Sequence, residues 1–182
     1  MIIKLLDGVT VEIESNGNNL IMEADKIYDK ATVITCSEEE NWIKNQKNDI
    51  RIFSWPGEYE LGDFLFYAEE ANNEKVVFVV RVEDMHIAHL GKAQNFSPEM
   101  LDKVDNIDVL ILPVNDTYLT PEEAKKVAQE FEARIIIPVG DNSDEFIKIM
   151  GNMEKKEPQL KAKITRNSLP HDKTEIIKLL KN

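Results

Sequence analysis

The sequence predicts an α/β fold (α+β by some schemes) in which sheet layers are flanked by helices. The first half of the 182-residue chain holds short strand-like segments separated by turn signals, and the second half alternates apolar strands with helical patterns. Hydrophobic residues make up 42% of the chain and charged residues 31%, which is ordinary for a globular protein. The length suits one hydrophobic core, so we expect a single domain over residues 1–182.

The first half reads as a series of β-hairpins. Asp7-Gly8 separates two strand-like runs and Asn16-Gly17 marks the next turn, so the chain should open as an antiparallel meander. A short apolar strand follows at residues 31–36. The alternating segment after Trp55-Pro56-Gly57 predicts another hairpin, which turns at Gly62-Asp63.

The chain is organised around a predicted hairpin over residues 76–90, with its tight turn at Glu83-Asp84. Two apolar runs, residues 107–114 and 133–139, predict further strands, the first buried on both faces. All three segments end in small or turn-forming residues. Loops of this kind carry catalytic groups in α/β enzymes.

Helices are predicted between and after these strands, and two closing strands at residues 160–165 and 174–180. The second helix, over residues 121–133, carries an apolar stripe at helical spacing. The helix starts are marked by Ser97 with Pro98, by Thr120 with Glu123 as a capping box, and by Ser143.

Composition narrows the function classes. The formal net charge of −12 repels phosphate backbones and anionic membranes, so we expect no nucleic-acid and no membrane partner. The lone cysteine, Cys36, excludes an internal disulfide and a cysteine-rich zinc knuckle. No apolar run approaches the roughly 18 residues of a membrane span and no signal peptide opens the chain, so a cytoplasmic location is expected.

Several segments together are familiar: ATVITCSEEENW, WPGEYELGDFLF, VVFVVRVEDMHIAHLGK and VDNIDVLILPVNDTYLTPEEAKKVAQEFEARIIIPVGD. This succession resembles the metallo-β-lactamase superfamily, and most closely its small zinc-dependent hydrolases related to ascorbate-6-phosphate lactonase. The similarity runs in order over nearly the whole chain. Its specific parts are the PGEYE turn, the HLG strand end and the succession of IDVLILPV, EEA and IIIPV. The resemblance implies an αββα sandwich of two mixed sheets flanked by helices, with a metal site at the strand ends along one edge.

The resemblance also implies where metal ligands should stand, and every such position departs from the family's pattern. The His-x-His-x-Asp-His loop falls on Cys36, Glu38, Glu40 and Asn41, and the bridging aspartate falls on Lys92. One histidine loop is shortened here to EEANNEK, and the last histidine falls in Val139-Gly140-Asp141, with Gly140 as the best match. We call the following residues the vestigial pocket: Cys36, Glu38, Glu40, Asn41, Lys92, Gly140 and Asp141.

Three interpretations of these residues stay open. Cys36, Glu38 and Glu40 could be atypical metal ligands, since thiolate and carboxylate both bind metals. Alternatively, Cys36 is a buried strand-end residue and the glutamates belong to a solvated acidic loop. In the third interpretation Lys92 replaces the lost cation and its ammonium group pairs with Glu38 or Glu40.

The remaining candidates carry weaker signals. His86 and His89 lie three apart on a strand and face opposite sides, so they cannot chelate one ion together, and we expect packing or hydrogen bonding. His171 should lie on the surface. Trp42 and Trp55 flank the rim of the expected site, where they could pack in the core or face a partner. No phosphate-binding loop and no serine nucleophile elbow is present in the sequence.

The favoured hypothesis is therefore a non-catalytic member (a pseudoenzyme) that acts as a binding or assembly subunit. Its partner would be a protein, either an active paralogue or a second copy of this chain. We expect no catalytic residue, no bound metal and no cofactor. The alternative is a metal-dependent hydrolase with atypical ligands, with zinc as its cofactor, or a small-molecule site that reuses the old cleft.

Overall fold

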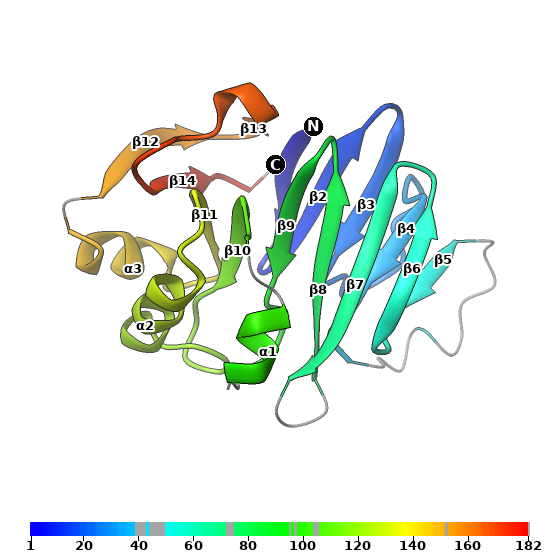
Figure 1. Cartoon of the computed structure of the whole chain (residues 1–182), viewed down its shortest axis with the longest axis horizontal. Helices are drawn as coiled ribbons and strands as arrows, with labels where there is room; N and C mark the ends of the chain where they lie inside the picture. Colours follow the sequence, from blue (N-terminus) through cyan, green and yellow to red (C-terminus); the bar gives the residue numbers. More distant parts are fainter. Residues whose placement is uncertain are drawn as a thin grey trace.

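The computed structural model contains two mixed β-sheets packed against each other, with helices beside the larger sheet (Figure 1). It describes residues 1–38, 43, 50–71, 75–94, 96, 98–103, 106–151 and 153–181. The predicted fold class is confirmed. Within these residues no helix is both long enough and apolar enough to span a lipid bilayer.

The first sheet has six described strands in the order β13-β1-β2-β3-β4-β5. Strands β1 to β3 form the antiparallel meander expected from the two turn signals, and β3, β4 and β5 run parallel. The bounds are β1 Ile2–Asp7, β2 Thr10–Ser15, β3 Asn18–Met22, β4 Val33–Thr35, β5 Arg51–Phe53 and β13 Ala162–Lys163.

The second sheet has eight described strands in the order β12-β14-β11-β10-β9-β8-β7-β6. Both predicted hairpins are confirmed: β6 pairs with β7 and β8 with β9. Strands β9, β10 and β11 are parallel, so their carboxyl ends lie at one edge of the sheet. The bounds are β6 Gly57–Leu61, β7 Phe64–Ala71, β8 Lys75–Val82, β9 Met85–His89, β10 Val109–Pro113, β11 Ile135–Val139, β12 Glu154–Gln159 and β14 Glu175–Leu179.

The described helices are α1 (Pro98–Lys103), α2 (Pro121–Phe131), α3 (Ser143–Ile149) and a short 3-10 helix (Arg166–Ser168). The capping box of α2 forms as predicted: the Glu123 backbone N–H donates to Thr120 Oγ1, and the Thr120 backbone N–H donates to the Glu123 carboxylate. Its predicted apolar stripe is buried. The helix ends two residues earlier than predicted because Glu132 adopts the left-handed conformation, with φ of 46°.

Three local predictions need correction. The cap residue of α3 is Asn142, which makes no side-chain capping bond, and Ser143 is the first helical residue, its hydroxyl donating to the Gly140 carbonyl. Strand β12 was not predicted, because its residues are mostly exposed and charged. The strand predicted at 160–165 shortens to Ala162–Lys163 and pairs with β1 in the first sheet. The expected cap Ser97 lies outside the described residues.

The core has three layers of apolar contact. The main cluster fills the space between the two sheets, and a second one joins the outer face of the eight-stranded sheet to α1, α2 and α3. The outer face of the six-stranded sheet is covered by a third cluster, which includes loop residues Ala24 and Ala31 and the partly buried Ile43. All the described α-helices therefore lie beside one sheet (Figure 1). The site described next lies where loops leave the strand ends.

Candidate functional site

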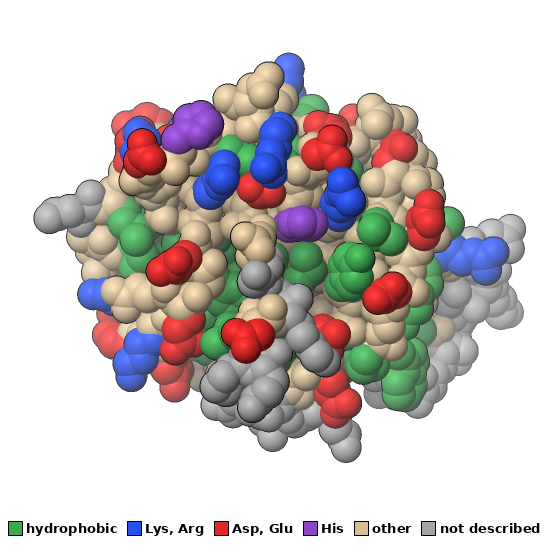
Figure 2. Space-filling model, in the orientation of Figure 1, with side chains coloured by type: hydrophobic (Ala, Val, Ile, Leu, Met, Phe, Trp, Pro, Cys, Tyr) green, Lys and Arg blue, Asp and Glu red, His purple; other side chains and the backbone are tan. Residues whose placement is uncertain are grey.

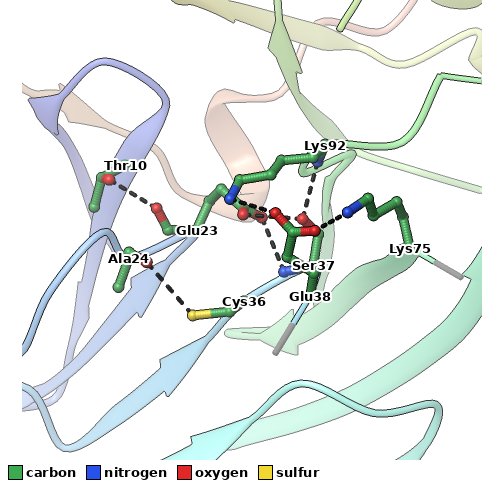
Figure 3. A network of polar contacts seen from close by, with 8 residues as sticks. All are labelled: Thr10, Glu23, Ala24, Cys36, Ser37, Glu38, Lys75 and Lys92. Atoms are coloured by element: carbon green, nitrogen blue, oxygen red, sulfur yellow. Dashed lines mark hydrogen bonds and ion pairs between the residues drawn. The ribbon is translucent and has the colours of Figure 1, made fainter. Parts of the chain in front are cut away.

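Two of the strand ends that the resemblance assigns to a metal site, those of β4 and β9, meet around Ser37 (Figure 3). Ser37 follows β4 and is fully buried. Its Oγ donates to Glu23 Oε1 over 2.9 Å, and its backbone N–H donates to Oε2 of the same carboxylate over 3.1 Å. The same Oγ accepts from the Lys92 backbone N–H at 3.0 Å, and the Ser37 carbonyl accepts from the Val76 N–H at 2.8 Å. We call Glu23, Ser37, Val76, Gly91 and Lys92 the Ser37 cluster.

Glu23 and Gly91 give this cluster its shape. Glu23 follows β3 with a positive φ of 54° and is 6% exposed. Its backbone N–H donates to the Thr35 carbonyl at 2.8 Å, and its own carbonyl accepts from Thr10 Oγ1 at 2.7 Å. Gly91 has φ of +57°, and a Cβ there would lie 2.4 Å from Ser37 Cβ and 2.7 Å from Glu23 Oε2. Glycine is therefore required by both the backbone conformation and the space.

Glu38 pairs with two lysines at the edge of this cluster (Figure 3). Lys92 Nζ donates to Glu38 Oε1 at 2.7 Å, and Lys75 Nζ forms an ion pair with Oε2. The Lys92, Lys75 and Glu38 side chains are 18%, 28% and 31% exposed. The predicted pairing of Lys92 with Glu38 is confirmed. Lys75 was missed, although it closes the shortened EEANNEK segment and is the cation there.

Cys36, the residue before Ser37, belongs to the apolar cluster on the outer face of the six-stranded sheet and not to the Ser37 cluster. Its side chain is buried, and its Sγ lies 3.5 Å from the Ala24 carbonyl oxygen that accepts from it. Its backbone N–H donates to the Phe53 carbonyl at 3.0 Å. These contacts match the interpretation of Cys36 as a buried strand-end residue.

Of the four remaining residues of the vestigial pocket, two lie at an edge of the eight-stranded sheet and two lie outside the described residues. Gly140 and Asp141 follow β11 at the sheet edge where β9 and β10 also end. Gly140 has φ of +98°, and a Cβ there would lie 2.7 Å from the Val114 carbonyl oxygen, whereas Asp141 is exposed. Glu40 and Asn41 lie outside the described residues, as does Trp42.

His89 supports the same strand end from inside. It is 2% exposed, its Nε2 lies 2.9 Å from the Val9 carbonyl oxygen, and its Nδ1 accepts from the Gly91 N–H at 2.9 Å. Because a carbonyl only accepts, the proton resides on Nε2 and the ring is neutral. Burial lowers the pKa of His89 to about 4. The expected packing and hydrogen-bonding role is confirmed, as is the exposed position of His171.

The described donors of this site fit a zinc ion poorly. Zinc takes carboxylate, imidazole or thiolate donors at roughly 2.0–2.3 Å. Each Glu38 oxygen contacts an ammonium group, and the Cys36 sulfur is buried against Ala24. The Lys92 charge would repel a cation held by Glu38. Within the described ranges, no three His, Cys, Asp or Glu side chains are grouped so that they could hold a metal ion.

Similar proteins share the fold. A family model described as "Beta-lactamase superfamily domain" matches residues 3–140. A proposed zinc-dependent hydrolase of the metallo-β-lactamase superfamily from Thermotoga maritima is 24% identical, with a TM-score of 0.78 and coverage of 99% of this chain and 100% of that one. No curated protein matches the chain.

Two further solved structures are similar in fold to this chain. The metallo-β-lactamase-fold protein YhfI from Bacillus subtilis has a TM-score of 0.66 at 9% identity, covering 99% of this chain and 96% of that one. A metallo hydrolase from Ignicoccus hospitalis has a TM-score of 0.62 at 9% identity, covering 81% and 89%. At these identities the likeness shows the fold, and the lactonase-like branch stays a prediction.

The close approach at Gly91 generates a stability prediction. Gly91→Ala should destabilise the protein by roughly 1 kcal/mol through its left-handed backbone and by a further 1–3 kcal/mol, roughly, through overpacking. The matched control is Gly151→Ala, since Gly151 has φ of +60° and a Cβ there would meet nothing within 4 Å. Urea denaturation of the two variants measures the difference. Equal losses would show that the space beside Ser37 is not restrictive.

The buried His89 generates a pH prediction. The folded-state pKa of about 4 lies below the ordinary value of 6.5, so the unfolded state binds the proton more tightly. Neutral His89 therefore contributes to the free energy of unfolding, and this contribution is fully present above about pH 6.5. As the pH falls toward 4, the free energy of unfolding decreases by on the order of 3 kcal/mol. Chemical denaturation from pH 7 to 4 should therefore show a smaller acid loss in His89→Gln than in His171→Gln. An identical loss in both would contradict the assignment.

Proposed function

We propose that this chain, which belongs to the β-lactamase superfamily domain family, is a non-catalytic member that acts as a binding or assembly subunit. One observation supports this proposal above the others: Lys75 and Lys92 both pair with Glu38. The resemblance assigns a metal ligand to the position of Glu38 and a metal-bridging aspartate to that of Lys92. The pairing of Glu38 with two ammonium groups supports the proposal, because a cationic side chain here neutralises a residue at a family ligand position.

The chemistry of these groups differs from that of a metal ion. A zinc ion acts as a Lewis acid and lowers the pKa of a bound water to about 7, which supplies a nucleophile at neutral pH. An ammonium group balances the Glu38 carboxylate but accepts no lone pair from water. The lysine ion pairs thus preserve the local charge balance and hold β8, β9 and the end of β4 together. They provide no hydrolytic step.

Metal content tests this proposal. Protein purified without an affinity tag, incubated with zinc and then desalted should hold well below one zinc per chain by elemental analysis. Lys92→Asp removes the cation and adds a donor, so this variant should retain more zinc than the wild type. Lys161→Asp, at an exposed lysine, makes the same charge change elsewhere and should behave like the wild type.

One or two tightly held ions per wild-type chain would overturn the proposal. The alternative, a metal-dependent hydrolase with atypical ligands, would then be favoured. In that case Glu38→Gln and Cys36→Ala should both lower the zinc content. If neither did so, the ion would lie outside this pair of residues.

The partner is proposed to be a protein, either a second copy of this chain or an active relative. Trp55 is 63% exposed, and Tyr67 on the neighbouring β7 is 40% exposed. Large exposed aromatic residues are enriched in protein interfaces. The segment is held in place because Tyr59 Oη donates to the Trp55 carbonyl at 2.9 Å, so the tryptophan is presented from an ordered turn.

Sedimentation velocity tests the self-association arm of this proposal. The wild type should associate with rising concentration, and Trp55→Ala should weaken the association at least about tenfold, as truncating an interface hot spot does. Leu160→Ala is the matched control, because Leu160 is 55% exposed and distant in sequence. A wild type that stays monomeric at all concentrations would contradict self-association.

A further inference from the structure

A second pocket, of about 820 Å³, opens at the opposite ends of the parallel strands. Its lining includes residues that precede or begin these strands, namely His86 in β9, Asp108 before β10 and Arg134 before β11. Gly91 and Lys92 of the Ser37 cluster, in contrast, follow the carboxyl end of β9. Figure 2 shows basic side chains and a histidine gathered over this part of the surface. The volume is in the range of small-molecule sites.

One wall of the pocket is basic and preorganised around a buried carboxylate. The Asp108 side chain is 6% exposed, and its Oδ2 accepts from the His86 backbone N–H at 3.0 Å and from Arg166 Nη1 at 3.0 Å. Arg134 Nε lies 3.7 Å from Oδ1. Asp108 thus orients two guanidinium groups that come from separate elements. Two positive charges share one negative charge, and the Arg side chains remain 41% and 53% exposed.

A second wall, which is acidic, lies at the end of α2. Glu130 and Glu132 line the pocket there, and the last turn of α2 contains no basic residue. The carboxyl end of a helix carries partial negative charge, which favours cations and disfavours carboxylates. Among the described residues, neither glutamate forms an ion pair. Within the described part of the chain, these two exposed glutamates therefore face the pocket without a paired cation.

We propose that this pocket binds a small zwitterion. Its anionic group, a carboxylate or a phosphate, pairs with Arg134 and Arg166, which can offer two parallel N–H donors to either group. Its ammonium group pairs with Glu130 and Glu132. Phe131 also lines the pocket and adds a small apolar surface, since it is 8% exposed. A simple anion would leave the acidic wall unpaired, and a simple cation would leave the arginines unpaired.

This proposal is independent of the metal content at Glu38, because no residue is shared between the two sites. It can be tested by nitrogen–proton correlation NMR of the intact 20.9 kDa chain. The probes are 6-aminohexanoate, with hexanoate and hexylamine as its single-charge counterparts, and phosphoethanolamine, with inorganic phosphate as its counterpart. We expect saturable shifts of the His86, Asp108 and Arg134 amides with the zwitterions, at least about tenfold tighter than with any single-charge probe. The stronger zwitterion identifies the anionic group.

Matched variants separate the two walls. Arg166→Gln should weaken the zwitterion at least about tenfold, whereas Arg51→Gln, at an exposed arginine on β5, should not. Glu130→Gln should weaken it while Glu122→Gln, exposed on the same helix, should not. Folding of each variant is checked by its unchanged amide spectrum away from the pocket.

Three results would overturn the proposal. The first is the absence of saturable shifts when either zwitterion is added to about 20 mM, which is well above the dissociation constant of about 1 mM typical of weak binding. The second is equal affinity for zwitterions and single-charge probes. The third is concentration-dependent broadening of the pocket amides without added probe, which would assign this surface to a second copy of the chain.

Discussion

The bidentate contact between Ser37 and the Glu23 carboxylate is the interaction on which the rest of this structure depends. It joins the end of β3 to the end of β4, and through the Lys92 and Val76 backbone groups it also joins the two sheets. A buried carboxylate left without these donors would be costly. The requirement for glycine at position 91 follows directly, since any side chain there would displace the serine or the carboxylate.

Local signals predicted the fold well. The Glu83-Asp84 turn and the Thr120–Glu123 capping box depend on neighbouring residues, so their chemistry is readable from the chain. Strand β12 was not predicted because it lies at a sheet edge, where charged residues replace an apolar pattern. The role of Glu23 was not predicted because its partner Ser37 is 14 residues away and its burial depends on the tertiary structure. The only hint was a charged residue directly after an apolar strand.

The two ends of the parallel strands use charge differently in a protein whose net charge is −12. At the carboxyl ends, two lysines pair with one glutamate. At the amino ends, two arginines share one aspartate beside an acidic helix end. In the first arrangement the charged groups pair with one another. The second leaves charges of both signs facing a cavity.

Strand β12 also bears on how this protein behaves when it is crowded. As an outermost strand it presents backbone groups to which a neighbouring molecule could add a strand of its own. Its sequence EKKEPQ sets charged side chains along that border, and Pro158 removes one of the N–H groups that pairing would need. The eight-stranded sheet therefore ends on this side in a border that resists growth into filaments, which favours solubility in concentrated solution.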